Sequence, residues 1–109
     1  MFADIKRTKQ FYQTFEPCSC EDCRRFIGQF SSQYAETANY LRSLGVDADK
    51  PFELICFDGE YICMYAVVGE AERGFSKKIG NITITVAEHH PATGLKEKHF
   101  VLEFDGISF

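Results

Sequence analysis

The spacing of apolar residues changes part-way along this chain, and that change constrains its fold more than any other feature. Before Gly45, apolar residues recur every three or four positions, which is the spacing of one stripe on a helix. After Phe52, branched and aromatic residues come in short runs that alternate with polar ones, which is the spacing of strands. Helices early and strands late predict an α+β fold, and no strand-helix-strand alternation indicates a doubly wound one.

The first half predicts one bent helix or two consecutive helices, beginning near Cys20 and ending at Gly45. The apolar stripe consists of Phe26, Ile27, Phe30, Tyr34, Ala38, Leu41 and Leu44. Gly28 and the pair at 31–32 weaken its middle, so we expect a bend or a break there. Residues 6–16, which mix Lys and Gln with aromatic residues, are predicted as a first strand or an irregular lead-in.

The second half predicts strands separated by turns. The runs are residues 52–57, 61–68, 81–87 and 100–104. Asp58-Gly59 between the first two is a strong hairpin signal. Residues 70–78 are charged and contain Gly74, and we expect a loop or an exposed edge there. The sequence thus predicts an antiparallel sheet of about four to five strands, covered on one face by the helical stripe.

Length and composition indicate one folded domain over residues 1–109. A chain of 109 residues buries roughly two-thirds of its unfolded surface, which is enough for one core. The 45% hydrophobic and 15% aromatic residues are typical of a globular domain. We find no internal repeat and no linker that would divide the chain.

Charge and hydropathy exclude several classes of partner. There are 16 acidic and 12 basic residues, a formal charge of −4, and the basic residues form no long run, which argues against nucleic acid. No stretch approaches the roughly 20 apolar residues of a membrane span, and the first residues lack the apolar block of a secretory signal. Five cysteines, an odd number, fit a disulfide framework poorly. We therefore expect a cytoplasmic protein with free or metal-bound thiols.

Three of the cysteines, Cys18, Cys20 and Cys23, lie within six residues at the predicted helix start. Ser19, with Asp22 three residues later, resembles a helix cap, which would put Cys20 and Cys23 on one side of the first turn. Three thiolates plus a histidine or water would complete the tetrahedron that zinc prefers. The candidate fourth ligands are His89, His90 and His99.

The same cluster allows two other interpretations. Cys20 and Cys23 have the C-x-x-C spacing at a helix start that thiol-disulfide exchange uses. Alternatively, one or two of the cysteines simply pack as small hydrophobic residues, since free Cys is often buried. Cys56 and Cys63 stand apart from the cluster, so the second C-x-x-C pair of a typical zinc ribbon is missing.

No catalytic motif accompanies the cysteines, so we expect a protein without enzymatic activity. The chain has no Gly-rich phosphate loop and no H-E-x-x-H motif. A protein-interaction module, such as a small acidic inhibitor or an immunity-type protein with structural cysteines, is the alternative from a different class. The oligomeric state and the identity of a protein partner do not follow from the sequence.

Several segments together resemble a small family of uncharacterised bacterial proteins with an N-terminal C-x-C-x-x-C-R motif. The matching segments are residues 11–15, 18–24, 40–47, 50–53, 78–81, 91–94 and 99–103. They span most of the chain. The resemblance implies a self-contained bacterial domain of unassigned activity, and it supplies no catalytic residues.

Overall fold

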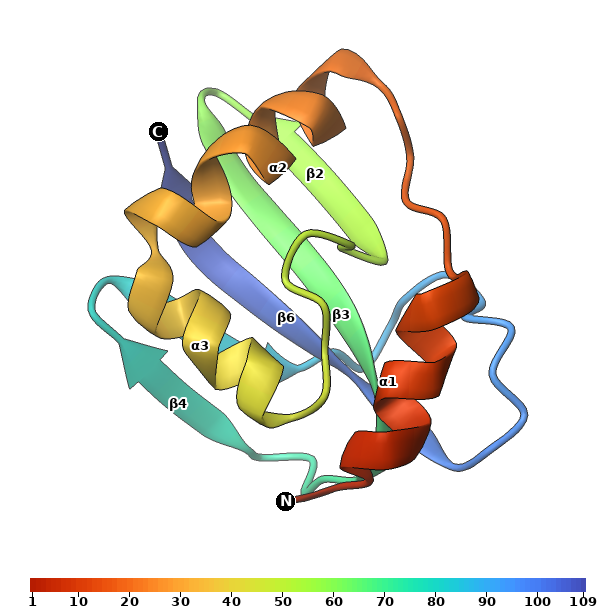
Figure 1. Cartoon of the computed structure of the whole chain (residues 1–109). Helices are drawn as coiled ribbons and strands as arrows, with labels where there is room; N and C mark the ends of the chain where they lie inside the picture. The colour runs from red at the N-terminus through yellow and green to blue at the C-terminus, as the bar shows by residue number, and fades with distance from the viewer.

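The centre of the molecule is a curled antiparallel sheet of six strands, seen in a computed structural model that describes residues 1–109 (Figure 1). The strands are β1 (Phe2–Ala3), β2 (Glu53–Phe57), β3 (Glu60–Glu70), β4 (Ser76–Ile79), β5 (Ile82–Val86) and β6 (His99–Ser108). Their order is β1-β3-β6-β5-β4, and β2 also pairs with β3. The α+β class and the antiparallel sheet are confirmed, with one strand more than the four to five predicted.

The hairpin between β2 and β3 forms at the predicted turn. Asp58 and Gly59 both have positive φ angles, of 55° and 81°, as a two-residue type I′ turn requires. The pairing then runs from Phe57 opposite Glu60 to Glu53 opposite Met64. This local turn sets the register of the whole hairpin.

Residues 70–78, predicted as a loop or an exposed edge, contain part of an edge strand. β4 pairs only with β5 and ends the strand order, so it is an edge of the sheet. Three of its four residues are exposed, among them Lys77 and Lys78. Lysines on an edge strand discourage pairing with other chains.

The prediction of a strand or an irregular segment for residues 6–16 is wrong, because most of this segment belongs to a helix, α1 (Ile5–Thr14). The Asp4 side chain caps the helix by accepting a hydrogen bond from the Arg7 backbone N–H over 3.1 Å. An aspartate in this position satisfies one of the free amides of the first turn.

Contacts with β3 hold α1 in place. Thr8 and Tyr12, four residues apart and therefore on one side of the helix, are both buried. The Tyr12 hydroxyl donates to the Ala66 carbonyl over 2.7 Å, and the Thr8 hydroxyl accepts from the Val68 backbone N–H over 3.0 Å. These partners lie far away in the sequence, so the helix depends on tertiary contacts.

The later helical segment forms two consecutive helices, α2 (Glu21–Gln33) and α3 (Ala35–Ser43), as one of the two predicted forms requires. The break lies at Tyr34, which has φ −125° and ψ 53°, and not at Gly28. The Tyr34 hydroxyl donates to the Ser108 carbonyl over 2.7 Å and accepts from the Ser108 N–H over 3.0 Å. These two hydrogen bonds connect the junction between α2 and α3 to the end of β6. None of the three helices is long and apolar enough to cross a membrane.

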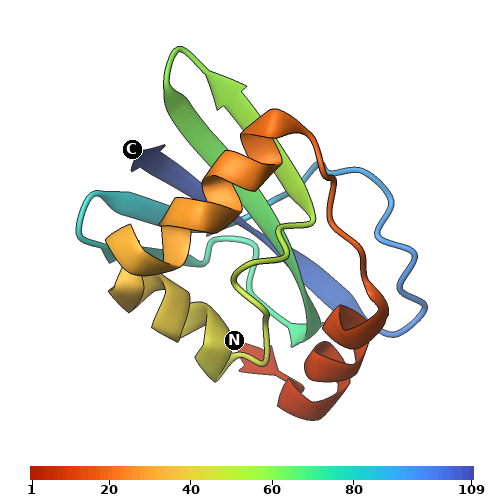
Figure 2. The ribbon, with the colours of Figure 1, turned by 45° about the horizontal axis from the view of Figure 1, so that its top comes forward.

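The main core combines side chains of helices and strands. Phe26 of α2 contacts Tyr61 of β3, with ring centroids 6.0 Å apart, and stacks on Phe30 at 4.7 Å. The core cluster consists of Tyr12, Phe26, Phe30, Ala38, Leu41, Leu44, Val46, Ala48, Tyr61, Cys63, Tyr65, Val67, Ile82, Ile84, Phe100, Leu102, Phe104 and Ile107. In both ribbon views α2 lies in front of β3 (Figures 1 and 2).

Candidate metal centre

The three clustered cysteines lie where the chain enters α2. Cys20 immediately precedes the helix, Cys23 lies in its first turn, and Cys18 lies in the segment before it. Their Sγ atoms all lie within 4.8 Å of one another. Cys18 and Cys20 are exposed, whereas Cys23 is only 6% exposed. The structure thus brings together the three predicted thiol ligands.

The predicted helix cap at Ser19 is wrong, although the helix starts close to the predicted position. The capping residue is Cys20, whose backbone is extended at φ −66° and ψ 169°. Its backbone N–H donates to the Cys18 Sγ atom over 3.4 Å, which fixes the chain just before the helix. The residue at the cap position is thus a cysteine and not a serine, and its side chain forms no capping hydrogen bond.

Cys20 and Cys23 differ in how readily they ionise. The backbone amide of Cys23 contributes most to lowering the pKa of Cys20, and the thiols of Cys23 and Cys18 contribute next. Burial raises the pKa of Cys23 to about 12, and the neighbouring thiols of Cys20 and Cys18 add to that effect. Of these two thiols, Cys20 therefore ionises first, beside the positive end of the α2 dipole.

The positions of the charged residues around the cluster can be explained without reference to the thiols. Glu21 and Asp22 lie in the first turn of α2, where carboxylates favour the positive end of the helix dipole. Arg25 approaches Glu21 at 3.6 Å, and both side chains are mostly exposed. Such an exposed pair contributes little to stability.

The thiol geometry suits a tetrahedral metal ion. Zinc binds thiolates at about 2.3 Å, so two sulfurs of a tetrahedral site lie about 3.8 Å apart. Separations of at most 4.8 Å between the Sγ atoms need a contraction of only about 1 Å to reach that geometry. Two of the sulfurs are on exposed side chains, which can make this adjustment without disturbing the core.

None of the three histidines belongs to the group of ligands that the structure brings together. His99 bonds with both ring nitrogens, Nδ1 to the Glu97 carbonyl at 2.8 Å and Nε2 to the Thr93 hydroxyl at 2.9 Å. His90 donates from Nδ1 to the Pro91 carbonyl at 2.8 Å, and His89 is exposed. A histidine as fourth ligand therefore stays a prediction of the sequence.

The other two cysteines are separate from the cluster. Cys63 is fully buried in β3, and burial raises the pKa of its thiol, as expected of a cysteine that packs. Cys56 lies on β2, is exposed, and forms no disulfide. It is therefore the natural control thiol for experiments on the cluster.

The largest cavity of the molecule lies elsewhere, between α1 and the loop that follows α3. The sequence does not predict it, because Lys9 is far along the chain from the other two cationic residues, Arg42 and Lys50. Only the unpredicted helix α1 brings Lys9 next to the other two.

Searches among models of known protein families, curated protein sequences and solved structures found no match to this chain. The thiol cluster itself therefore provides the basis for a functional proposal.

Proposed function

We propose that the protein binds a zinc ion through the thiolates of Cys18, Cys20 and Cys23. The observation that carries the proposal is the convergence of three Sγ atoms to within 4.8 Å of one another. Sulfur ligands favour zinc among the common divalent ions, whereas magnesium and calcium take oxygen ligands.

The hydrogen bonds of the cluster support this proposal. A thiolate at Cys18 already has an N–H donor, the backbone of Cys20, which would offset part of its charge. Cys20 ionises more readily than Cys23, so it would bind the ion before Cys23 does. Cys23 would lose its proton only on metal binding, because burial raises its pKa to about 12. Metal binding would therefore release protons and become tighter as the pH rises.

We further infer that α2 covers one face of the sheet and so anchors the site. Phe26, one turn after Cys23, is fully buried and contacts Tyr61. Cys23 is itself buried at the start of the same helix. Of the three ligands, Cys23 would be the fixed one, and the exposed Cys18 and Cys20 would close around the ion.

The fourth ligand in the isolated chain would be a water molecule, since the group contains three thiols and no histidine. A water-bound position is exchangeable, and a side chain of a partner protein can replace the water there. A metal site of this kind needs no catalytic residues, in keeping with the sequence.

Titration with cobalt(II) tests this proposal, since cobalt replaces zinc in tetrahedral sites and absorbs visible light. We expect the sulfur-to-cobalt charge-transfer and d–d bands of a tetrahedral thiolate site, saturating at one ion per chain. Cys18→Ser, Cys20→Ser and Cys23→Ser should each weaken binding by about a hundredfold or more. Cys56→Ser is the matched control and should bind as the wild type does. Spectra typical of octahedral cobalt without sulfur bands would contradict the proposal.

The opposite pKa shifts of Cys20 and Cys23 favour one second candidate, a thiol-disulfide exchange site. Here the Cys20 thiolate would attack a disulfide such as oxidised glutathione, releasing one glutathione thiolate and forming a mixed disulfide. The Cys23 thiol, on losing its proton, would displace the second glutathione and leave a Cys20–Cys23 disulfide. Measuring the reduction potential of that pair in metal-free protein separates the candidates. A potential near that of the glutathione pool supports exchange, and failure to form the disulfide excludes it.

A further inference from the structure

The largest cavity, about 560 Å³, is an open groove between α1 and the loop after α3. Its volume is within the range of roughly 300–1,000 Å³ that is usual for small-molecule sites. Its charged lining residues are Lys9, Arg42, Asp47 and Lys50. We refer to it as the α1–α3 groove.

The backbone of the loop after α3 lies very close to the backbone of α1 beside the groove. Gly45 has a φ angle of +87°, and a Cβ atom there would lie 2.5 Å from the Ile5 carbonyl oxygen at the start of α1. Tyr12, Gly45 and Val46, which line the groove, are buried. The loop after α3 is therefore in close backbone contact with the start of α1 at Gly45.

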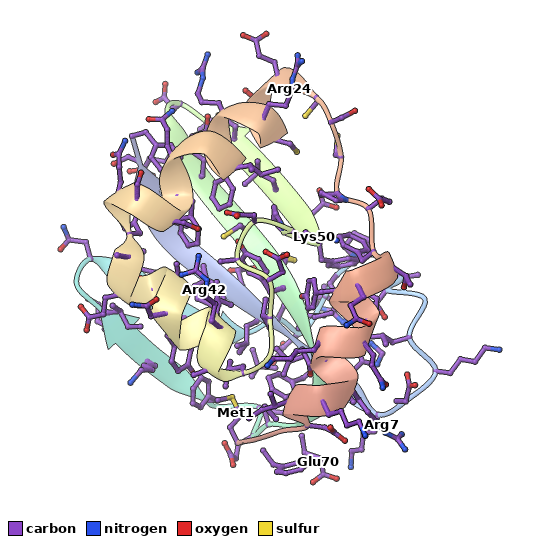
Figure 3. All side chains as sticks on the ribbon, in the orientation of Figure 1. Met1, Arg7, Arg24, Arg42, Lys50 and Glu70 are labelled. Carbon is purple, nitrogen blue, oxygen red and sulfur yellow. The ribbon has the colours of Figure 1, made fainter.

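The α1–α3 groove concentrates positive charge on a chain whose formal charge is −4. Lys9, Arg42 and Lys50 line it, and Asp47 is its only carboxylate, which leaves a formal excess of two positive charges. The structure contains four ion pairs, and none of them involves these three cations. Figure 3 shows Arg42 and Lys50 on the face of the molecule that carries α1 and α3. Their charges are thus available to an anion.

Helix capping accounts for only one of these cations. The Lys50 ammonium donates to the Tyr12 carbonyl in the last turn of α1 over 2.7 Å, a usual role for a lysine at a helix end. Arg42 has no such role, because the carbonyls of Leu41 and Arg42 already accept backbone N–H groups from the residues that follow the helix. Lys9 lies in the middle of α1 and has no carbonyl to cap.

Neutral partners orient the Arg42 guanidinium without neutralising it. It donates to the Asn39 side-chain oxygen and to the Ser31 hydroxyl, each over 3.1 Å. Ser31 in turn donates to Asp49 over 3.0 Å, which fixes the hydroxyl. An arginine has five N–H donors, so most of them stay free for a ligand.

We propose that the α1–α3 groove binds the phosphate group of a small molecule. An oriented guanidinium matches two phosphate oxygens, and the ammonium groups of Lys9 and Lys50 supply the remaining charge. The formal excess of two positive charges matches a phosphate dianion. This site is independent of the thiol cluster, and neither proposal depends on the other.

Inorganic phosphate is the probe for an NMR titration of the full chain, followed by amide shifts at constant ionic strength. We expect saturable shifts at the amides of Gly45, Val46 and Asp47, and weaker or no shifts around α2. Lys9→Gln and Arg42→Gln should each weaken binding by about tenfold. Lys9 is exposed and forms no ion pair, so its replacement should not disturb the fold.

Arg24→Gln is the matched control, because Arg24 is an exposed cation on another part of the surface (Figure 3). It removes the same charge as Arg42→Gln and should leave phosphate binding unchanged. Non-saturating shifts, or equal weakening by Arg24→Gln and Lys9→Gln, would show general attraction of anions and overturn the proposal. Shifts centred on residues outside the groove would overturn it as well.

Discussion

The backbone N–H of Cys20 donates a hydrogen bond to the Sγ atom of Cys18 over 3.4 Å. This bond joins the segment before α2 to the residue that caps the helix, and it holds two of the three clustered thiols together before any ion arrives. Less conformational entropy is then lost when the site closes around a metal. This hydrogen bond is local, since only one residue separates the two cysteines.

In metal-free protein, Cys20 should react with iodoacetamide faster than Cys23 at neutral pH. The pKa of Cys20 is lowered, so more of it is thiolate, whereas burial raises the pKa of Cys23 to about 12. Tandem mass spectrometry of the peptide that contains both residues measures the order of labelling. As the pH rises, Cys20 labelling should level off first, and Cys23 labelling should keep rising at higher pH. Equal rates at both residues would contradict the assignment.

The free energy of unfolding should fall as the pH rises through the alkaline range. Burial raises the pKa of Tyr12 above its ordinary 10.0, so the unfolded chain loses that proton before the folded chain does. The stability linked to Tyr12 is therefore complete below about pH 10 and is lost above it. Urea denaturation at several pH values measures the slope.

Tyr12→Phe is the control for this alkaline effect. It should lower stability at neutral pH by about 1 kcal/mol, because the hydrogen bond to the Ala66 carbonyl is lost. The variant should also lose less stability than the wild type above about pH 10, since one of the titrating hydroxyls is gone. An unchanged slope would show that Tyr12 is not the responsible group.

Two glycine-to-alanine changes should act in opposite directions. At Gly69, where φ is +142°, a Cβ atom would lie 2.0 Å from the Phe2 carbonyl oxygen of β1, and we expect a loss of about 2 kcal/mol or more. Gly28 lies inside α2 with nothing within 4 Å of its added Cβ, so alanine should stabilise by about 0.5–1 kcal/mol. Thermal and urea unfolding measure both. Equal effects of the two changes would contradict this placement of β1 and α2.

Replacing all three histidines by glutamine should leave zinc affinity unchanged. The thiol group of the structure contains no histidine, and both ring nitrogens of His99 already have hydrogen-bond partners. Competition with a chromophoric chelator measures the affinity of the triple variant. If affinity falls by more than about tenfold, a histidine is a ligand, as the sequence predicts, and single variants at His89, His90 and His99 identify it.

The parts of the fold that could be predicted from the sequence are those that local chemistry determines. Asp58-Gly59 specifies a turn by its two positive φ angles, and the alternation in residues 81–87 specifies β5. The sequence prediction differs at α1, where the buried side includes the polar Thr8 and is held by contacts with β3, more than fifty residues later. Two local signals do indicate this helix, the Asp4 cap and the helical spacing of Ile5, Thr8 and Tyr12.

The two candidate sites also differ in how much of each can be predicted from the sequence. The thiol cluster follows from the spacing of three cysteines across one helix start, so the sequence alone predicts their convergence. The α1–α3 groove cannot be predicted in this way, because Lys9 lies near Arg42 and Lys50 only when α1 is packed against β3. The sequence places the cap one residue too early, at Ser19, because serine is a preferred capping residue and cysteine is not.

The zinc content of tag-free protein, measured together with the number of protected thiols, tests the central claim most directly. We predict one zinc ion per chain, with Cys18, Cys20 and Cys23 protected from alkylation until a chelator is added. Cys56→Ser should keep the zinc, and serine at any clustered position should lose it. Protein without zinc after metal-replete purification, or the same loss in Cys56→Ser as in Cys20→Ser, would contradict the assignment of a metal site to this cluster.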